Sequence, residues 1–361
     1  MRVASSRALD VEGQVLFLRS DAGPQIGIGH AMRLLALAQA WIDRGGQAVI
    51  GMSDTVPPVV DRYRSEGIGV LTMGQDRGSM LDADETVEVA LEQGATWIGV
   101  DGYWFDSPFQ DRVVGSGIPL LCVDDEGLAE HYRARLLVNQ NLHADRALYP
   151  LRGEDAPTLL GPQFAMLRRE FRLGAQAARG ETSTVARRIL VTLGGADPAG
   201  ATATVLRALQ YLTIEGLSAE VVVGAANSRY DELDVLASAL SLRVRLTRSV
   251  EDMVPLMRAA DIAITSGGTT VWELAAMGVP SIVGAVAEIE VALLRGLGQF
   301  DLFEGVGWFR DLGARELAAR IQALALDMPR RIAMRRGARS IVDGAGADRV
   351  VSEMMRLAVR E

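Results

Sequence analysis

Short apolar runs alternate with longer amphipathic stretches along most of the chain. An unbroken apolar run is typical of a strand that is buried on both faces of a parallel sheet. In the first half such runs predict strands at Val15–Leu18, Ala48–Gly51, Gly69–Leu71, Trp97–Asp101 and Leu120–Val123. The intervening stretches, most clearly Ala31–Arg44 and Glu85–Glu92, have the spacing of helices. Strands that alternate with helices predict the α/β class.

A second series of strand and helix patterns follows a small, polar segment. That segment runs from Gly174 to Arg188, and its weak pattern predicts an interdomain linker. Beyond it, helices are expected from about Thr202, from about Thr270, and over roughly Gly313 to Arg360. The strand patterns of this half are "RILVTLGG", "AEVVVGAA", "VRVRLTRS", "DIAITSGG" and "PSIVGAV".

The length of 361 residues indicates two domains, because a single hydrophobic core rarely grows so large. We expect a flexible N-terminal extension over residues 1–13, Rossmann-like domains over 14–175 and 176–345, and a C-terminal helix over 346–361. Both domains are predicted to be doubly wound parallel sheets. Ligands of open α/β sheets bind at the carboxyl ends of the strands. The loops at those ends, facing a cleft between the domains, are therefore the candidate site.

Composition and charge narrow the class of protein. A net charge of −9 argues against a nucleic-acid groove over the whole surface. The single cysteine, Cys122, lies in the apolar run "IPLLCVDD" and predicts a buried strand residue in a reducing cytoplasm, without internal disulfides. No Cys/His cluster has the spacing of a zinc site, and no window is long and apolar enough for a membrane span or a signal peptide. We therefore expect a cytoplasmic protein without a metal or cofactor.

The stretch "RSDAGPQIGIGHAMRLLALAQAW" brings two glycines and a histidine to the start of an amphipathic helix. Gly27 and Gly29 allow a tight turn and a close approach to a ligand. The helix dipole, worth about 0.3–1 kcal/mol, disfavours a protonated His30, so a neutral imidazole is available as a general base. The alternative is a histidine that merely packs at the helix start. Arg33 lies on the neighbouring helix face and is expected either to reach a substrate anion or to pair with Asp21.

Two glycine-containing loops stand out in the second half. In "VTLGGADPAGAT", Gly194 and Gly195 are able to bring backbone N–H groups against a phosphate, whereas Asp197 is typical of a turn or a helix start. In "TSGGTTVWEL", the residues Ser266 to Thr270 form a donor-rich turn that enters a helix, which predicts an anion site. Glu273 either accepts hydrogen bonds from a ribose diol or is an ordinary first-turn glutamate.

Several segments together resemble the PseG/SpsG family. Besides the histidine stretch, the segments "VDGYWFD", "CVDDEGLAEHYRARLLVNQN", "LLGPQFAMLRREF", "VTLGGADPAGAT" and "TSGGTTVWELAAMGVPSI" resemble family segments in the family's order. The characterised enzyme of that family hydrolyses UDP-2,4-diacetamido-2,4,6-trideoxy-β-L-altropyranose during pseudaminic acid synthesis. The family is similar to MurG-type glycosyltransferases. The resemblance therefore implies a GT-B architecture, in which the C-terminal helix typically crosses back to the first domain, and a reaction that needs no metal.

The resemblance also implies roles for individual residues. His30 becomes the base that activates water for attack at the anomeric carbon, and UDP is released. The first domain would then hold the base and the sugar, and the second the nucleotide. The implied substrate-binding residues are Asp21, Gly27, Gly29, Arg33, Tyr103 and Asn141. The implied nucleotide-binding residues are Gly194, Gly195, Ser266, Gly267, Gly268, Thr269, Thr270, Glu273 and Glu288. His131 and His143 are interpreted as surface-loop residues without a role.

Two departures from the family pattern affect the functional prediction. The family usually carries Glu-Asn-Gln where this chain has Glu288, Ile289 and Glu290, and Gly102 stands at a position that is often polar in relatives. A carboxylate cannot donate the hydrogen bonds of an amide, so both changes are expected to touch the sugar pocket. The prediction is a UDP-sugar hydrolase. The alternatives are a nucleotide-sugar-dependent glycosyltransferase on the same scaffold and a non-catalytic nucleotide-sugar binding protein.

Overall fold

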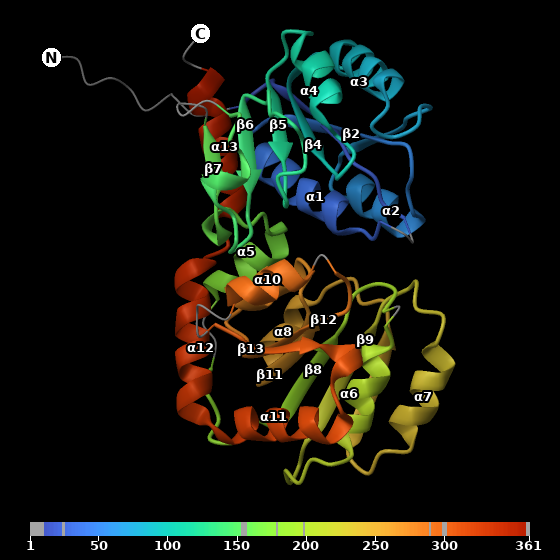
Figure 1. Cartoon of the computed structure of the whole chain (residues 1–361), viewed down its shortest axis with the longest axis vertical. Helices are drawn as coiled ribbons and strands as arrows, with labels where there is room; N and C mark the ends of the chain where they lie inside the picture. Colours follow the sequence, from blue (N-terminus) through green and yellow to red (C-terminus); the bar gives the residue numbers. More distant parts are fainter. Residues whose placement is uncertain are drawn as a thin grey trace, which may run out of the picture. The chain divides into compact units, whose positions relative to one another are not determined.

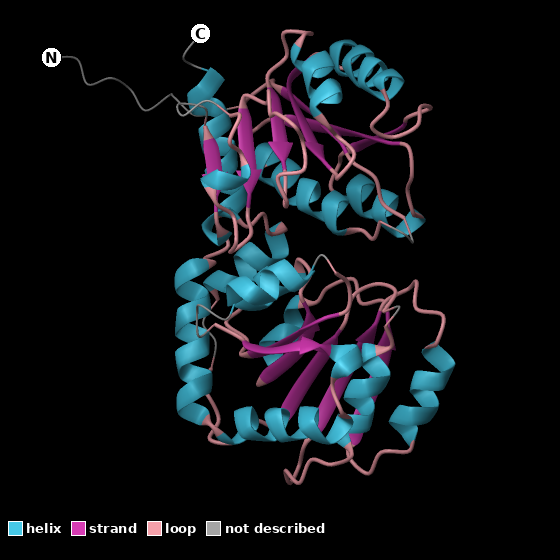
Figure 2. Cartoon of the chain, viewed as in Figure 1, coloured by secondary structure: helices cyan, strands magenta, loops and turns pink. Residues whose placement is uncertain are grey.

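The protein folds into two α/β units, seen in a computed structural model (Figures 1 and 2). Unit 1 consists of residues 1–169 and 345–361, and unit 2 of residues 170–344. The structure describes residues 11–23, 26–152, 157–177, 180–197, 199–288, 290–297 and 302–358. Most of the predicted N-terminal extension thus lies outside the described residues, although Val11 is fully buried in the core of unit 1.

Unit 1 is built on a seven-stranded parallel sheet with the order β3-β2-β1-β4-β5-β6-β7. The five predicted strands are confirmed with bounds that differ by at most two residues at either end. The strands are β1 (Val15–Arg19), β2 (Gln47–Met52), β3 (Gly69–Thr72), β4 (Ala95–Asp101), β5 (Leu120–Val123), β6 (Leu136–Asn139) and β7 (Thr158–Leu160). The edge strand β7 is short and only half-buried, which is why its sequence pattern is weak.

Helices cover both faces of this sheet (Figure 1). One core cluster joins α1, α2 and α13 to the sheet, and a second joins α3 and α4 to its other face. Cys122 of β5 is buried in the second cluster, as predicted, and burial raises the pKa of its thiol well above the ordinary value. The helices are α1 (Gly29–Ile42), α2 (Pro57–Ser65), α3 (Met80–Glu92), α4 (Ser107–Val114) and α13 (Gly346–Ala358), with 3-10 turns at Arg146–Leu148 and Pro162–Phe164.

Unit 2 has a six-stranded parallel sheet with the order β10-β9-β8-β11-β12-β13. The strands are β8 (Arg188–Thr192), β9 (Ser218–Val223), β10 (Arg243–Arg248), β11 (Ile262–Ser266), β12 (Ser281–Ala285) and β13 (Glu304–Trp308). The helices are α5 (Arg169–Gln176, which begins at the unit boundary), α6 (Ala201–Leu209), α7 (Tyr230–Ser238), α8 (Val254–Ala259), α9 (Thr270–Ala276), α10 (Glu290–Leu297), α11 (Ala314–Leu326) and α12 (Met328–Ile341), with a 3-10 turn at Phe309–Asp311. The predicted helix starts near Thr202 and Thr270 are confirmed.

The small, polar segment that predicts a linker lies inside unit 2. The chain passes between the units at residues 169–170 and again at residues 344–345. Three arginines of α12 hold the segment by donating to its backbone carbonyls: Arg331 to Ser183 and Thr184, Arg335 to Gly180, and Arg339 to Ala175. The composition of the segment does not reveal these contacts, because the helix that makes them lies some 150 positions away in the sequence.

Each sheet has one place where the strand order reverses. In unit 1 the reversal lies between β1 and β4, and in unit 2 between β8 and β11. Loops that leave neighbouring strands in opposite directions open a crevice at such a point, where ligands of doubly wound sheets bind. His30 follows β1, and Ser266 ends β11. In the described part of the chain, no helix is long and apolar enough to cross a bilayer.

Candidate active site

His30 is paired with a buried carboxylate at the reversal point of unit 1. Its Nδ1 lies 2.7 Å from Oδ1 of Asp101, the last residue of β4. Asp101 is completely buried, and His30 is 8% exposed on the first turn of α1. A carboxylate at this distance accepts the Nδ1–H proton and so leaves Nε2 as the basic nitrogen. This is the arrangement of a general base held by an orienting group.

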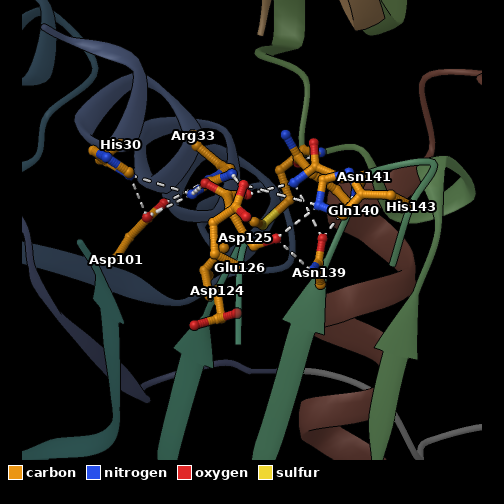
Figure 3. Close-up of polar contacts among 12 residues, drawn as sticks. His30, Arg33, Asp101, Asp124, Asp125, Glu126, Asn139, Gln140, Asn141 and His143 are labelled. Atoms are coloured by element: carbon orange, nitrogen blue, oxygen red, sulfur yellow. Dashed lines mark hydrogen bonds and ion pairs between the residues drawn. The ribbon is translucent and has the colours of Figure 1, made fainter. Parts of the chain in front are cut away.

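Arg33 joins the pair to a second carboxylate (Figure 3). Its Nε and Nη2 donate to the two oxygens of Asp101 at 2.6 and 2.7 Å, and its Nη1 and Nη2 donate to those of Asp125 at 2.7 and 3.0 Å. Burial alone would raise the pKa of Asp125, but the Arg33 guanidinium outweighs it and lowers that pKa to about 2. Both edges of the guanidinium are therefore engaged by the protein itself.

The expected pairing of Arg33 with Asp21 is wrong. Asp21 is completely buried and accepts the backbone N–H groups of Ser53 and Asp54 at 2.7 and 2.9 Å, besides an ion pair with Arg19 at 2.8 Å. Asp21 therefore fixes the loop after β2. Asp101 and Asp125 are closer partners of Arg33 because the carboxyl ends of β4 and β5 lie next to that of β1.

Polar residues that follow β5 and β6 extend the cluster around Asp125 (Figure 3). Asn141 donates from Nδ2 to Oδ1 of Asp125 at 2.7 Å, and Asn139 donates to the backbone oxygen of the same residue at 3.0 Å. His143, predicted to be a surface residue, is half-buried, and its Nε2 lies 3.0 Å from that backbone oxygen. Glu126 stands beside it, and burial raises the pKa of this carboxyl.

Aromatic rings border the histidine on another side. The Tyr103 ring lies edge-on to the imidazole, with centroids 4.7 Å apart, and the Trp104 ring is 6.1 Å away. Tyr103 is 45% exposed, so part of its side chain forms an accessible rim next to His30. A Cβ atom at Gly102 would lie 2.7 Å from the Trp104 ring, which explains the glycine at this departure from the family pattern.

Sequence reasoning missed Asp101, Asp125 and His143 as members of the site. Two of them had a usable signal. Asp101 ends a predicted strand, and Asp125 comes two residues after another, so their place at the carboxyl edge of the sheet follows from the strand pattern. The order of the strands, which brings both residues to His30, had no such signal.

In unit 2 the two predicted glycine loops lie side by side. A Cβ atom at Gly194, whose φ is 83°, would lie 4.0 Å from the Ser266 hydroxyl oxygen. A Cβ atom at Gly224 would lie 2.2 Å from the carbonyl oxygen of Gly195, so the loops after β8 and β9 are in backbone contact. Asp197 accepts the N–H groups of Ala201 and Thr202, the first two residues of α6, at 2.8 and 2.9 Å, which confirms the prediction of a turn or helix-start residue.

A side chain of the protein already occupies part of the turn after β11. Glu290, 9% exposed, accepts the N–H groups of Val286 and Ala287 at 2.7 and 3.3 Å. Burial raises the pKa of its carboxyl, while hydrogen bonds from the Ser266 hydroxyl and the Gly267 N–H partly oppose this rise. Two donors of the predicted anion site are thus engaged.

The remaining predicted nucleotide-binding residues lie in this turn or after it. Gly268, Thr269 and Thr270 lead into α9, where Glu273 is half-buried in the first turn. Glu288 is different: its side chain is 83% exposed and lies 3.7 Å from Arg310. Ile289, the middle residue of the departure, lies outside the described residues. Within the described ranges, no group of three or more His, Cys, Asp or Glu residues is placed to hold a metal ion.

Comparison with known proteins places this geometry in context. Residues 189–285 match the C-terminal domain of glycosyltransferase family 28. The chain is 30% identical over 210 residues to the spore coat polysaccharide biosynthesis protein SpsG of Bacillus subtilis, a match that covers 56% of this chain and 59% of SpsG. It is 23% identical over 269 residues to an uncharacterized protein of Methanocaldococcus jannaschii, covering 73% of this chain and 54% of that protein. The chain thus spans a little more than half the length of these relatives.

Solved structures establish the fold. MurG of Acinetobacter baumannii superposes with a TM-score of 0.67 at 15% identity, covering 95% of this chain and 99% of MurG. Anabaena HepE, in complex with UDP-glucose, gives a TM-score of 0.63 at 15% identity, covering 95% of this chain and all of HepE at 100%. The predicted GT-B fold, made of two Rossmann-like α/β domains, is confirmed. The chain therefore has the GT-B fold, and part of its sequence is similar to SpsG.

Proposed function

We propose that the chain is an enzyme that binds a UDP-sugar and breaks the bond between the sugar C1 and the diphosphate, with water as the nucleophile. The observation that carries the proposal is the His30–Asp101 pair, 2.7 Å apart at the carboxyl end of β1 and β4. A binding protein has little use for a base held by an orienting carboxylate. The likeness to SpsG and the GT-B fold support a nucleotide-sugar substrate.

In this reaction the unprotonated Nε2 of His30 removes a proton from water. The water oxygen forms a bond to C1, and the bond between C1 and the diphosphate oxygen breaks, so that UDP leaves with the electron pair. Asp101 holds the imidazole in the required tautomer and stabilises the imidazolium that forms. A positioned general base of this kind contributes roughly 10²–10⁴-fold to the rate.

The other contacts are assigned from position and chemistry. We assign the sugar to the accessible rim of unit 1, where Tyr103 and Asn141 flank the base. We assign the diphosphate to the backbone of Gly194, Gly195 and the Ser266–Thr270 turn, with Glu273 on the ribose. Arg33 acts through the two carboxylates that it holds and makes no direct contact with a substrate anion, because both edges of its guanidinium are engaged.

Transfer of the sugar to an acceptor hydroxyl is the second candidate. The match of residues 189–285 to a glycosyltransferase domain favours it. The same histidine would deprotonate the acceptor instead of water, so the two candidates share one base and one nucleotide site. They differ only in which oxygen attacks C1.

The decisive experiment follows UDP release from a panel of UDP-sugars, including the UDP-diacetamido-trideoxyhexose, in ¹⁸O-water. Hydrolysis at C1 places the label in the sugar, and label in UDP contradicts it. Turnover that appears only with an added acceptor supports transfer, and tight binding without any product supports a binding protein. His30→Ala should lower turnover about 10²–10⁴-fold. The matched control is His131→Ala, because His131 also pairs with a carboxylate, Asp111, but at the surface.

A further inference from the structure

The Glu290 carboxylate joins two separate loops of unit 2. One oxygen accepts the N–H groups of Val286 and Ala287, in the loop after β12. The Ser266 hydroxyl and the Gly267 N–H, which belong to the turn after β11, lie close enough to lower the pKa of the same carboxyl. A Cβ atom at Gly267 would lie 2.9 Å from the Glu290 Cβ, and one at Gly268 would lie 3.7 Å from its Oε1. Gly267 therefore leaves the room that this side chain occupies.

Helix capping accounts for only half of these contacts. Glu290 is the first residue of α10, and its side chain reaches back to two N–H groups of the loop that precedes the helix. A cap of α10 does not need donors from the turn after β11. The groups that stabilise the charged form of this carboxyl are the backbone N–H groups of Val286, Ala287 and Gly267 and the hydroxyl of Ser266. The donors of this turn therefore face an anion that belongs to the protein itself, the Glu290 carboxylate.

We infer that Glu290 determines specificity at this turn by disfavouring the free nucleoside diphosphate relative to its sugar ester. This inference rests on the proposed function, which assigns the diphosphate to the same turn. A terminal β-phosphate carries one more negative charge near neutral pH than the same phosphate esterified to a sugar, because its second pKa is about 6. A fixed carboxylate beside it repels the extra charge, and it does so strongly in a partly buried site.

The consequence is faster release of the product. UDP is repelled more than UDP-sugar, so it leaves the turn more readily after the C1 bond has broken. An amide at this position, as in the usual Glu-Asn-Gln pattern, would not supply that repulsion. A repulsive charge of this kind lowers the affinity for both ligands, and it lowers the affinity for UDP more.

The test compares dissociation constants for UDP and UDP-N-acetylglucosamine by isothermal titration calorimetry at pH 8. Glu290→Gln removes the charge but keeps an acceptor for the cap. We expect it to tighten UDP binding about tenfold and UDP-N-acetylglucosamine binding no more than about threefold. We compare the ratio of the two constants in the variant with the ratio in the wild type. The contribution of the probe's own sugar is common to both proteins and cancels in this comparison. The matched control is Glu316→Gln, which removes the same charge from a side chain of α11 that is 57% exposed, and it should leave the ratio unchanged.

Each outcome separates the inference from the proposed function. Weaker UDP binding by Glu290→Gln, or an equal change for both ligands, overturns the inference and leaves the proposed function standing. Failure of all three proteins to bind either nucleotide overturns both. If Glu290→Gln does not fold, Glu290→Ala provides the same comparison, because it removes the same charge and is likewise expected to favour UDP.

Discussion

At the scale of single residues, the site depends on the ion pairs that Arg33 makes with two carboxylates. Asp101 and Asp125 lie on either side of Arg33, so this group carries one net negative charge. The imidazolium that forms at His30 during the proposed reaction neutralises that charge. Without Arg33, neither carboxylate would have a permanently charged partner, and loss of the charged partner of a buried ion pair is strongly destabilising.

The low pKa of Asp125 predicts a pH-dependent contribution to stability. A carboxyl whose pKa falls from 3.8 to about 2 on folding stabilises the folded state fully only above its unfolded pKa, and this stability is lost as the pH falls towards 2. The full contribution is about 2 kcal/mol, of which roughly half remains at pH 3. The difference in free energy of unfolding between the wild type and Asp125→Asn should therefore shrink by about 1 kcal/mol between pH 6 and pH 3 in urea titrations. It should be equal at pH 6 and pH 8, and a constant difference down to pH 3 contradicts the prediction.

At the scale of elements, α12 serves as a support for an irregular segment. Arg331, Arg335 and Arg339 are spaced by four residues, so they lie on one helix face and reach successive carbonyls of the segment before β8. Arg331 is completely buried and also donates to the carbonyl oxygens of Leu324, at 2.8 Å, and Ala325 at the end of α11. The helix therefore ties together parts of unit 2 that lie far apart in sequence.

Loss of the buried arginine should destabilise unit 2. Arg331→Leu fills a similar volume but leaves the carbonyls of Ser183 and Leu324 without their donors, at a cost of about 3 kcal/mol. Chemical denaturation measures this as a lower free energy of unfolding. Arg336→Leu, on the exposed side of the same helix, is the control and should change stability by no more than about 0.5 kcal/mol. Equal effects of the two substitutions would show that the hydrogen bonds of Arg331 do not contribute to the stability of unit 2.

At the scale of the whole molecule, the sequence pattern predicted those elements of the fold whose positions depend on local burial. The strands β1 to β5 are unbroken apolar runs because both faces of the sheet are covered, so their positions follow from hydrophobicity alone. His30 and the glycine turns were candidates from the sequence because local glycines and helix starts mark them. The partners of Arg33 lie 68 and 92 positions away and required the strand order. The polar segment after α5 was interpreted as a linker because its arginine partners are equally remote in sequence.

The path of the chain makes unit 1 depend on residues that follow unit 2. The helix α13 packs on α1, and its residue Met354 is completely buried in the cluster that contains Trp41. Met354→Ala should lower the free energy of unfolding by about 2–5 kcal/mol. Hydrogen exchange measured by mass spectrometry should then rise in α1 and β1, whereas β8 and β11 should keep their protection, because the lost contacts all belong to unit 1. Met80→Ala, the same substitution at a residue that is 49% exposed on α3, should leave exchange in both sheets unchanged. Deprotection that appears first in β8 and β11 would mean that α13 stabilises the molecule through unit 2 rather than by completing the core of unit 1.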